Sequence, residues 1–225
     1  YVFHNFDHAE ARFGLADPGN IYGRLTNSTQ GVFEDRIAAL EGGTAGLAVA
    51  SGAAAVEYAV RNITQSGDHI VAAKNVYGGT FNLLRHTLPR DGITTTFVSA
   101  ENPQEFETPS RRTPSSSTSR PSATRRRPAR LRGHHRHRPQ APPAGDRGQH
   151  LRLPVPVPPA GARADVVVES ATKFIGGHGT TLGGVIVEGG KFNWAEVPGK
   201  FPTLTEPDPS YHGLNFYEAL GGAAS

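Results

Sequence analysis

The sequence predicts an α/β fold with a mostly parallel sheet covered by helices, and two observations lead to that prediction. Short apolar runs that suit buried strands recur at 46–50, 69–73, 94–98, 165–168 and 183–187. Segments with helical spacing or helix-forming composition lie between the first three of these runs. Strands that alternate with helices are typical of a parallel sheet with helices on both faces.

The helices follow from local signals. An apolar stripe spaced i, i+4, i+7 predicts the first of them, and an Ala-rich run to about Ile63 predicts the second. Thr80 to Leu88 is expected to be a third. The residues that mark the first helix are Phe33, Ile37 and Leu40 in its stripe, Ser28 or Thr29 as its N-cap, and Gly42 as its left-handed stop.

Composition divides the chain into residues 1–107, 108–163 and 164–225. The middle segment holds thirteen Arg, eleven Pro and a single acid, Asp146, and therefore carries a net charge of +12. Because the whole chain carries +3, the two outer segments together carry about −9, the difference between these values. The basic pI is thus a local property and does not predict a nucleic-acid partner. No apolar run is long enough for a membrane span, and Cys is absent, so no disulfide or thiolate metal site is expected.

Two interpretations of residues 108–163 stay open. The segment has no helical or strand period, so it is expected to lack regular structure, as a disordered insert that binds RNA or another anionic surface would. A structureless loop of that length is unusual inside a compact α/β domain, however. The alternative is translation out of frame: the codons of 148–152, read one base later, permit Asp-Asn-Thr-Phe-Ala.

The strongest chemical signal is 170–179, Ser-Ala-Thr-Lys-Phe-Ile-Gly-Gly-His-Gly, directly after a buried run. A lysine at a strand end, flanked by hydroxyls and glycines, suits a Schiff base with a phosphate-bearing aldehyde. Burial would lower the pKa of the Lys173 amine and make it a nucleophile and then a base. The alternative is a surface lysine in a glycine-rich turn.

Three weaker signals precede it, and each has an ordinary structural alternative. Gly52 and Ala53 open a helix after a short strand, where backbone N–H groups can bind an anion. Tyr22 and Arg24 could contact phosphate, the latter through its guanidinium fork. Tyr77 lies after a strand, where its ring could stack on a cofactor.

Together and in this order, the four signals resemble the Cys/Met-metabolism (transsulfuration) family of pyridoxal-phosphate (PLP) enzymes. Two further stretches, Gly176–Gly179 and 204–213 (Leu-Thr-Glu-Pro-Asp-Pro-Ser-Tyr-His-Gly), are most similar to its O-acetylhomoserine sulfhydrylase branch. The resemblance covers about 1–107 and 164–225. It implies a fold-type-I PLP-dependent transferase large domain, divided between these two segments.

The resemblance also implies residue roles. Lys173 would carry PLP as a Schiff base and would be catalytic together with Tyr77, which would stack on the pyridine ring. Tyr22 and Arg24 would reach the PLP phosphate of a neighbouring subunit, within a dimer or tetramer. The phosphate ligands from the same subunit would be the backbone amides of Gly52 and Ala53 and the hydroxyls of Ser170 and Thr172.

This sequence departs from the family pattern in several places. The aspartate that pairs with the PLP ring nitrogen belongs in a Val-Asp-Asn-Thr-Phe stretch, and the chain has Arg147 to Leu151 there. Met is absent even at position 1, and the chain stops at Ser225, so the natural start and the small C-terminal domain are expected to be missing.

The implied activity is cytoplasmic synthesis of homocysteine and acetate from O-acetyl-L-homoserine and sulfide. A methionine γ-lyase or cystathionine γ-synthase activity is the alternative within the family. A non-catalytic remnant whose basic segment binds polyanions is the alternative from a different class.

Overall fold

The computed structural model describes residues 1–14, 16–99, 131–133, 165–196 and 199–221. In the described residues before the central segment there are four helices and three strands, with a π-helical turn (Leu83–Thr87) and a 3-10 turn (Leu88–Asp91) after the fourth helix. These elements are α1 (Phe6–Phe13), α2 (Ser28–Glu41), β1 (Ala45–Val49), α3 (Gly52–Ile63), β2 (His69–Ala73), α4 (Gly78–Asn82) and β3 (Thr94–Val98).

The other described residues form three strands and two short helices, of which the first strand lies within the central segment: β4 (Leu131–Gly133), β5 (Val166–Glu169), β6 (Gly184–Glu188), α6 (Pro202–Thr205) and α7 (Phe216–Leu220). Two 3-10 turns, Trp194–Glu196 and Pro209–Tyr211, lie among them. None of the helices in the described residues is long and apolar enough to cross a membrane.

The described strands form two sheets. One has the order β1-β6-β5-β4, and the other pairs β2 with β3 in parallel. β6 is antiparallel to both β1 and β5, whereas β4 is parallel to β5. Three of the four strands in the larger sheet therefore run in one direction, which confirms the prediction of a mostly parallel arrangement. The registers are Ala45↔Glu188, Val166↔Glu188, Leu131↔Val166 and His69↔Thr94.

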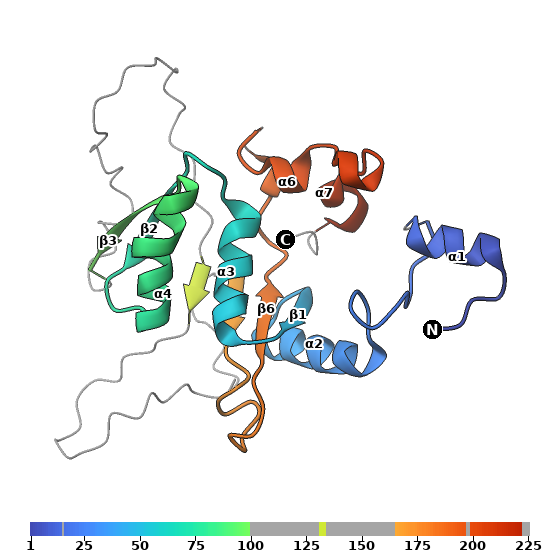
Figure 1. Cartoon of the computed structure of the whole chain (residues 1–225), viewed down its shortest axis with the longest axis horizontal. Coiled ribbons are helices and arrows are strands. Elements are labelled where there is room, and N and C mark those ends of the chain that lie inside the picture. Colours follow the sequence, from blue (N-terminus) through green and yellow to red (C-terminus); the bar gives the residue numbers. More distant parts are fainter. Residues whose placement is uncertain (15, 100–130, 134–164, 197–198, 222–225) are drawn as a thin grey trace.

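Helices cover both faces of the larger sheet (Figure 1). Along β6, Val185 and Val187 pack on Ile37 and Ala38 of α2. Ile186, between them, faces the other way and joins the cluster of α3, because alternate strand residues point to opposite faces. This alternation is why all of β6 is buried.

The hydrophobic cluster on the α3 face of the sheet includes a set of aromatic rings. Phe192, Trp194 and Phe201 meet edge to face, with ring centroids 4.6 to 5.8 Å apart. Ala55 and Ala59 of α3 leave room for them because alanine is small. The segment that follows β6 is thus fixed to the same core that positions the start of α3.

The N-cap of α2 was predicted wrongly. We expected Ser28 or Thr29, but Asn27 caps the helix, and its side chain accepts hydrogen bonds from the amides of Thr29 and Gln30. Asn27 has extended backbone angles, as an N-cap residue requires, whereas Ser28 is already helical. The stop at Gly42 is confirmed, with φ of 70°.

The expectation that 108–163 lacks regular structure is wrong at three residues. Leu131–Gly133 form β4, which pairs with Val166–Val168 of β5. Strand pairing uses main-chain groups, so it does not need the side-chain period whose absence led to the prediction. The rest of that segment lies outside the described residues, and so does Asp146.

Candidate cofactor site

The start of α3 and the end of β5 meet at one place, beside the 170–183 connection to β6 (Figure 1). A Cβ atom added to Gly52 would lie 2.5 Å from the Cβ of Ser170 and 2.8 Å from its hydroxyl oxygen. Only glycine allows so close an approach. The structure therefore brings together two of the predicted phosphate ligands, which are far apart in the sequence.

Two backbone N–H groups at the start of α3 have no hydrogen-bond acceptor among the described residues. Ser51 caps α3, because its Oγ accepts from the amide of Ala54 at 3.1 Å and its carbonyl accepts from Ala55. The amides of Gly52 and Ala53 have no acceptor among the described residues. Two unpaired N–H groups at a helix N-terminus attract an anion. With the Ser170 hydroxyl beside them, they fit a phosphate group.

Thr172 holds the ends of the 170–183 connection together. Its hydroxyl donates to the carbonyl of Gly183 at 3.1 Å and accepts from the Gly183 amide at 3.0 Å, while its own amide donates to the same carbonyl. In this structure the Thr172 hydroxyl therefore closes the loop. A bond from this hydroxyl to phosphate stays a prediction.

Lys173 is exposed, although we expected it to be buried. The chain makes a tight turn here, in which the Lys173 amide donates to Ser170 O and the Lys173 carbonyl accepts from Gly177. Gly177 and Gly179 have φ of 73° and 67°, and they carry the chain outward from the sheet. The loop has no described element over it, which is the physical reason for the exposure.

Tyr77 lies in the turn that follows β2. It is the first residue before α4, it is 47% exposed, and its ring packs over Gly79 of the same turn. Among the described residues, its ring and hydroxyl make no hydrogen bond or aromatic contact. Stacking on a cofactor ring remains a prediction.

Tyr22 and Arg24 contact each other in the connection between α1 and α2. Arg24 Nη2 donates to the Tyr22 hydroxyl, and the guanidinium carbon lies 5.1 Å from the ring centroid. Within the part of the chain that the structure describes, no hydrogen bond joins either of them to residues 170–173.

Two buried carboxyl groups of the larger sheet were missed by sequence reasoning; Glu169 directly precedes Ser170, whereas Glu188 pairs with the first residues of β1 and β5, at the opposite end of the sheet. Burial is the main cause that raises the pKa of Glu169, at the end of β5, to about 7. Burial also raises the pKa of Glu188, at the end of β6, to about 7, against opposing effects of the Gly190 amide and the Trp194 indole. The Trp194 N–H lies near this carboxyl without standard hydrogen-bond geometry. The signal in the sequence that could have identified these two residues is their position at the ends of apolar strands.

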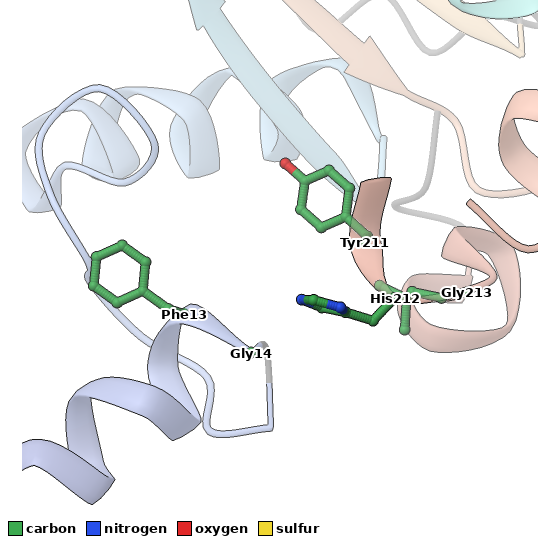
Figure 2. Close-up of a pocket in the computed structure, with 6 residues that line it drawn as sticks. Phe13, Gly14, Tyr211, His212 and Gly213 are labelled. Carbon is green, nitrogen blue, oxygen red and sulfur yellow. The ribbon is translucent and has the colours of Figure 1, made fainter. Parts of the chain in front are cut away.

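A pocket of about 340 Å³ lies elsewhere, between the end of α1 and the turn that follows Pro209–Tyr211. Figure 2 shows the rings of Phe13, Tyr211 and His212 around a common space. None of the predicted site residues lines it. The pocket is therefore separate from the α3–β5 cradle.

An α/β domain with a lysine in a glycine-rich loop beside a helix N-terminus fits the class of proteins that bind a phosphate group, and a phosphate-bearing aldehyde such as PLP is one ligand that it suits. Comparison with known sequences agrees. The model of the family described as Cys/Met metabolism PLP-dependent enzyme matches residues 1–115 and 152–211. The chain belongs to this family.

Several curated relatives are similar over nearly the whole chain. The O-acetyl-L-homoserine sulfhydrylase of Leptospira meyeri is 45% identical over 98% of this chain and 50% of its own length. The homocysteine/cysteine synthase of Saccharomyces cerevisiae is 40% identical over 100% of this chain and 51% of its own. The chain thus spans about half the length of the curated relatives it matches.

A solved structure from Campylobacter jejuni, described as an O-acetylhomoserine (thiol)-lyase with a pyridoxyl-lysine phosphate, has the same fold. Its TM-score is 0.71 at 30% sequence identity, over 96% of this chain and 54% of that one. The prediction of a fold-type-I PLP-dependent large domain is confirmed by this similarity and by the family match.

Proposed function

We propose that this chain binds PLP covalently through Lys173 and derives from an enzyme that makes homocysteine from O-acetyl-L-homoserine and sulfide. The observation that carries the proposal is the contact between Gly52 and Ser170, beside the unpaired amides of Gly52 and Ala53. That arrangement suits the phosphate of a cofactor whose aldehyde reaches a lysine three residues beyond Ser170. Family membership and the names of the relatives support the reaction type.

In the proposed reaction, PLP withdraws electrons from the substrate α-carbon when it is bound. The amine of Lys173 would take the proton from that carbon and return it later. Acetate leaves from Cγ, and the sulfur of sulfide forms the new bond at the same carbon. The exposed loop that carries Lys173 leaves its amine free to approach the substrate. Thr172 would hold the loop while the amine moves.

The proposal includes a second copy of the chain. Arg24 and Tyr22 form a pair that makes no described contact with 170–173 of their own chain, and Arg24 is exposed. We propose that this pair reaches the phosphate of a neighbouring copy. The test mixes Arg24→Ala with Lys173→Ala. If the site is shared, mixed dimers regain one intact site, and PLP binding recovers to roughly a quarter of the native level. No recovery would contradict a shared site.

The activity itself is tested by measuring homocysteine formed from O-acetylhomoserine and sulfide. The assay uses a full-length parent enzyme in which the family's Asp-Asn-Thr-Phe stretch is restored, with Lys173→Ala as the control. Turnover that depends on Lys173 supports the proposal. Preference for cystathionine formation or for methionine breakdown in the same substrate panel would assign the enzyme to another branch.

A further inference from the structure

Two side chains of α2, Gln30 and Glu34, bind the outer edge of β1. This strand stands at one end of the larger sheet, so one of its edges pairs with β6 and the other faces no described strand. On that outer edge the Ala48 amide donates to Glu34 Oε1 at 2.7 Å, and the Ala48 carbonyl accepts from Gln30 Nε2 at 3.3 Å. Gln30 Nε2 also donates to Glu34 Oε1 at 2.8 Å, which orients the two side chains. We call these three residues the α2 clip.

The clip can form because the backbones of α2 and β1 approach each other closely at Gly46. A Cβ atom at that position would lie 2.7 Å from the carbonyl oxygen of Glu34 and 3.4 Å from its Cα. A larger residue would therefore push the helix away from the strand. Glu34 is half-buried against β1, and a carboxylate oxygen accepts a main-chain N–H more strongly than a neutral oxygen does. The packing and the hydrogen bonds thus place the same turn of α2 on the same strand.

The strand that the clip holds leads directly into the α3–β5 cradle. Ala48 lies three positions before Ser51, the residue that caps α3. On the β6 side, a Cβ atom at Gly184 would overlap the Ser51 carbonyl oxygen, so β6 supports this turn from below. Gly52 follows and touches Ser170. The approach to α3 is therefore fixed by β6 along one edge of β1 and by the α2 clip along the other.

Water could satisfy the outer edge of β1 as well as these side chains do, so the net energy of the clip is small. What the side chains add is position, because they belong to a helix that is packed on the sheet. The proposed phosphate site needs the amides of Gly52 and Ala53 at a set distance from the Ser170 hydroxyl. Hydrogen bonds weaken steeply when that geometry is lost.

We propose that Gln30 and Glu34 are positioning residues: by holding both main-chain groups of Ala48, they set the start of α3 for the phosphate of the cofactor. The inference rests on the proposed PLP function. It gives the clip no part in the bond between the aldehyde and Lys173. It therefore predicts that loss of the clip weakens binding of the phosphate and leaves binding of the aldehyde unchanged.

The test compares Glu34→Ala with the native chain in binding of PLP and of pyridoxal, which is the same aldehyde without the phosphate. Affinity is measured by absorbance titration of the lysine-bound ligand. We expect the PLP affinity of Glu34→Ala to fall roughly three- to tenfold, as when one hydrogen bond to the phosphate is lost. Its pyridoxal affinity should stay at the native value. An equal fall for both ligands, or no fall for PLP, would overturn the inference.

Three further variants separate the clip from a general effect on the fold. Glu34→Gln keeps an oxygen that can accept from the Ala48 amide, so it should restore native PLP affinity; affinity as low as that of Glu34→Ala would contradict the clip. Asp35→Ala, the matched control, removes the next acid of α2 at an exposed side chain and should bind PLP normally. Gln30→Ala removes the longer bond to Ala48. It should lower PLP affinity in the same direction by a smaller factor, and it replaces Glu34→Ala if that variant does not fold.

If the native chain does not bind PLP at all, the proposed function fails. Amide exchange in the ligand-free chain then decides the inference separately. The amides of Ala54 and Ala55 report on the turn, because they donate to the Oγ and the carbonyl of Ser51. Faster exchange of both amides in Glu34→Ala than in the native chain and in Asp35→Ala supports the inference, and equal exchange overturns it.

Discussion

Gly52 and Ser170 are in contact across 118 positions of sequence, with a Gly52 Cβ position only 2.5 Å from the Ser170 Cβ. The contact joins the N-terminus of α3 to the end of β5. It explains why a glycine is needed at the start of this helix, where the chain would otherwise tolerate most residues.

Gly52→Ala should therefore destabilise the fold and the cradle together. Its Cβ would overlap Ser170, and overpacking of this kind costs about 1–3 kcal/mol. The free energy of unfolding, measured in urea, should fall by that amount, and PLP affinity should fall with it. Gly31→Ala is the control, because a Cβ there has open space within α2. It should be neutral or stabilise by about 0.5–1 kcal/mol. A stable Gly52→Ala chain with native PLP affinity would contradict the contact.

Thr172→Val should loosen the loop that carries Lys173. Valine matches threonine in shape but lacks the hydroxyl that both donates to and accepts from Gly183. Loss of these bonds should cost about 1–2 kcal/mol. The measurement is amide exchange at Gly183, which should become faster. Thr172→Ser keeps the hydroxyl and should behave as the native chain does. Unchanged exchange in Thr172→Val would show that the loop is closed by other contacts.

Glu188 should make stability depend on pH. Its folded pKa of about 7 is higher than the 4.5 of an ordinary glutamate. A raised carboxyl pKa means that the folded state binds the proton more tightly than the unfolded state does. The contribution of Glu188 to the free energy of unfolding is therefore fully present below pH 4.5. It is lost as pH rises through 7, by at most roughly 3 kcal/mol. Urea unfolding at pH 5.5 and 8.5 should show a smaller difference for Glu188→Gln than for the native chain. Equal differences would contradict burial of an ionisable Glu188.

Turnover by the chain as written should be very low, even with PLP bound. The family's aspartate, which keeps the PLP ring nitrogen protonated, is absent from 147–151. Loss of a paired charge at a reacting centre costs several kcal/mol of barrier, about tenfold in rate for each 1.4 kcal/mol. Homocysteine formation is compared with that of a full-length enzyme containing the Asp-Asn-Thr-Phe stretch. Similar rates would show that the aspartate is dispensable.

Local patterns predicted most of the elements. β2 was expected at 69–73 and is found at His69–Ala73, and the Ala-rich helix ends at Ile63 as expected. Apolar runs and caps act within a few residues, so a sequence contains them directly. The choice of Asn27 as N-cap could not be made this way, because three consecutive residues there all have suitable side chains.

Features that depend on contacts between distant segments were harder to predict from the sequence. An apolar run does not indicate strand direction, so the antiparallel placement of β6 between β1 and β5 was not predicted. The contact of Gly52 with Ser170 depends on how distant elements pack. The exposure of Lys173 likewise depends on what covers its loop.

The most direct test of the central claim is to locate the lysine that carries the cofactor. The PLP-loaded chain is reduced with borohydride, digested, and its pyridoxyl-labelled peptides are identified by mass spectrometry. The sequence offers four lysines: Lys74, Lys173, Lys191 and Lys200. The account predicts stoichiometric label on Lys173, and no label in Lys173→Ala under conditions in which Lys191→Ala is labelled normally. Label spread over the other lysines, or label retained at full stoichiometry in Lys173→Ala, would contradict it.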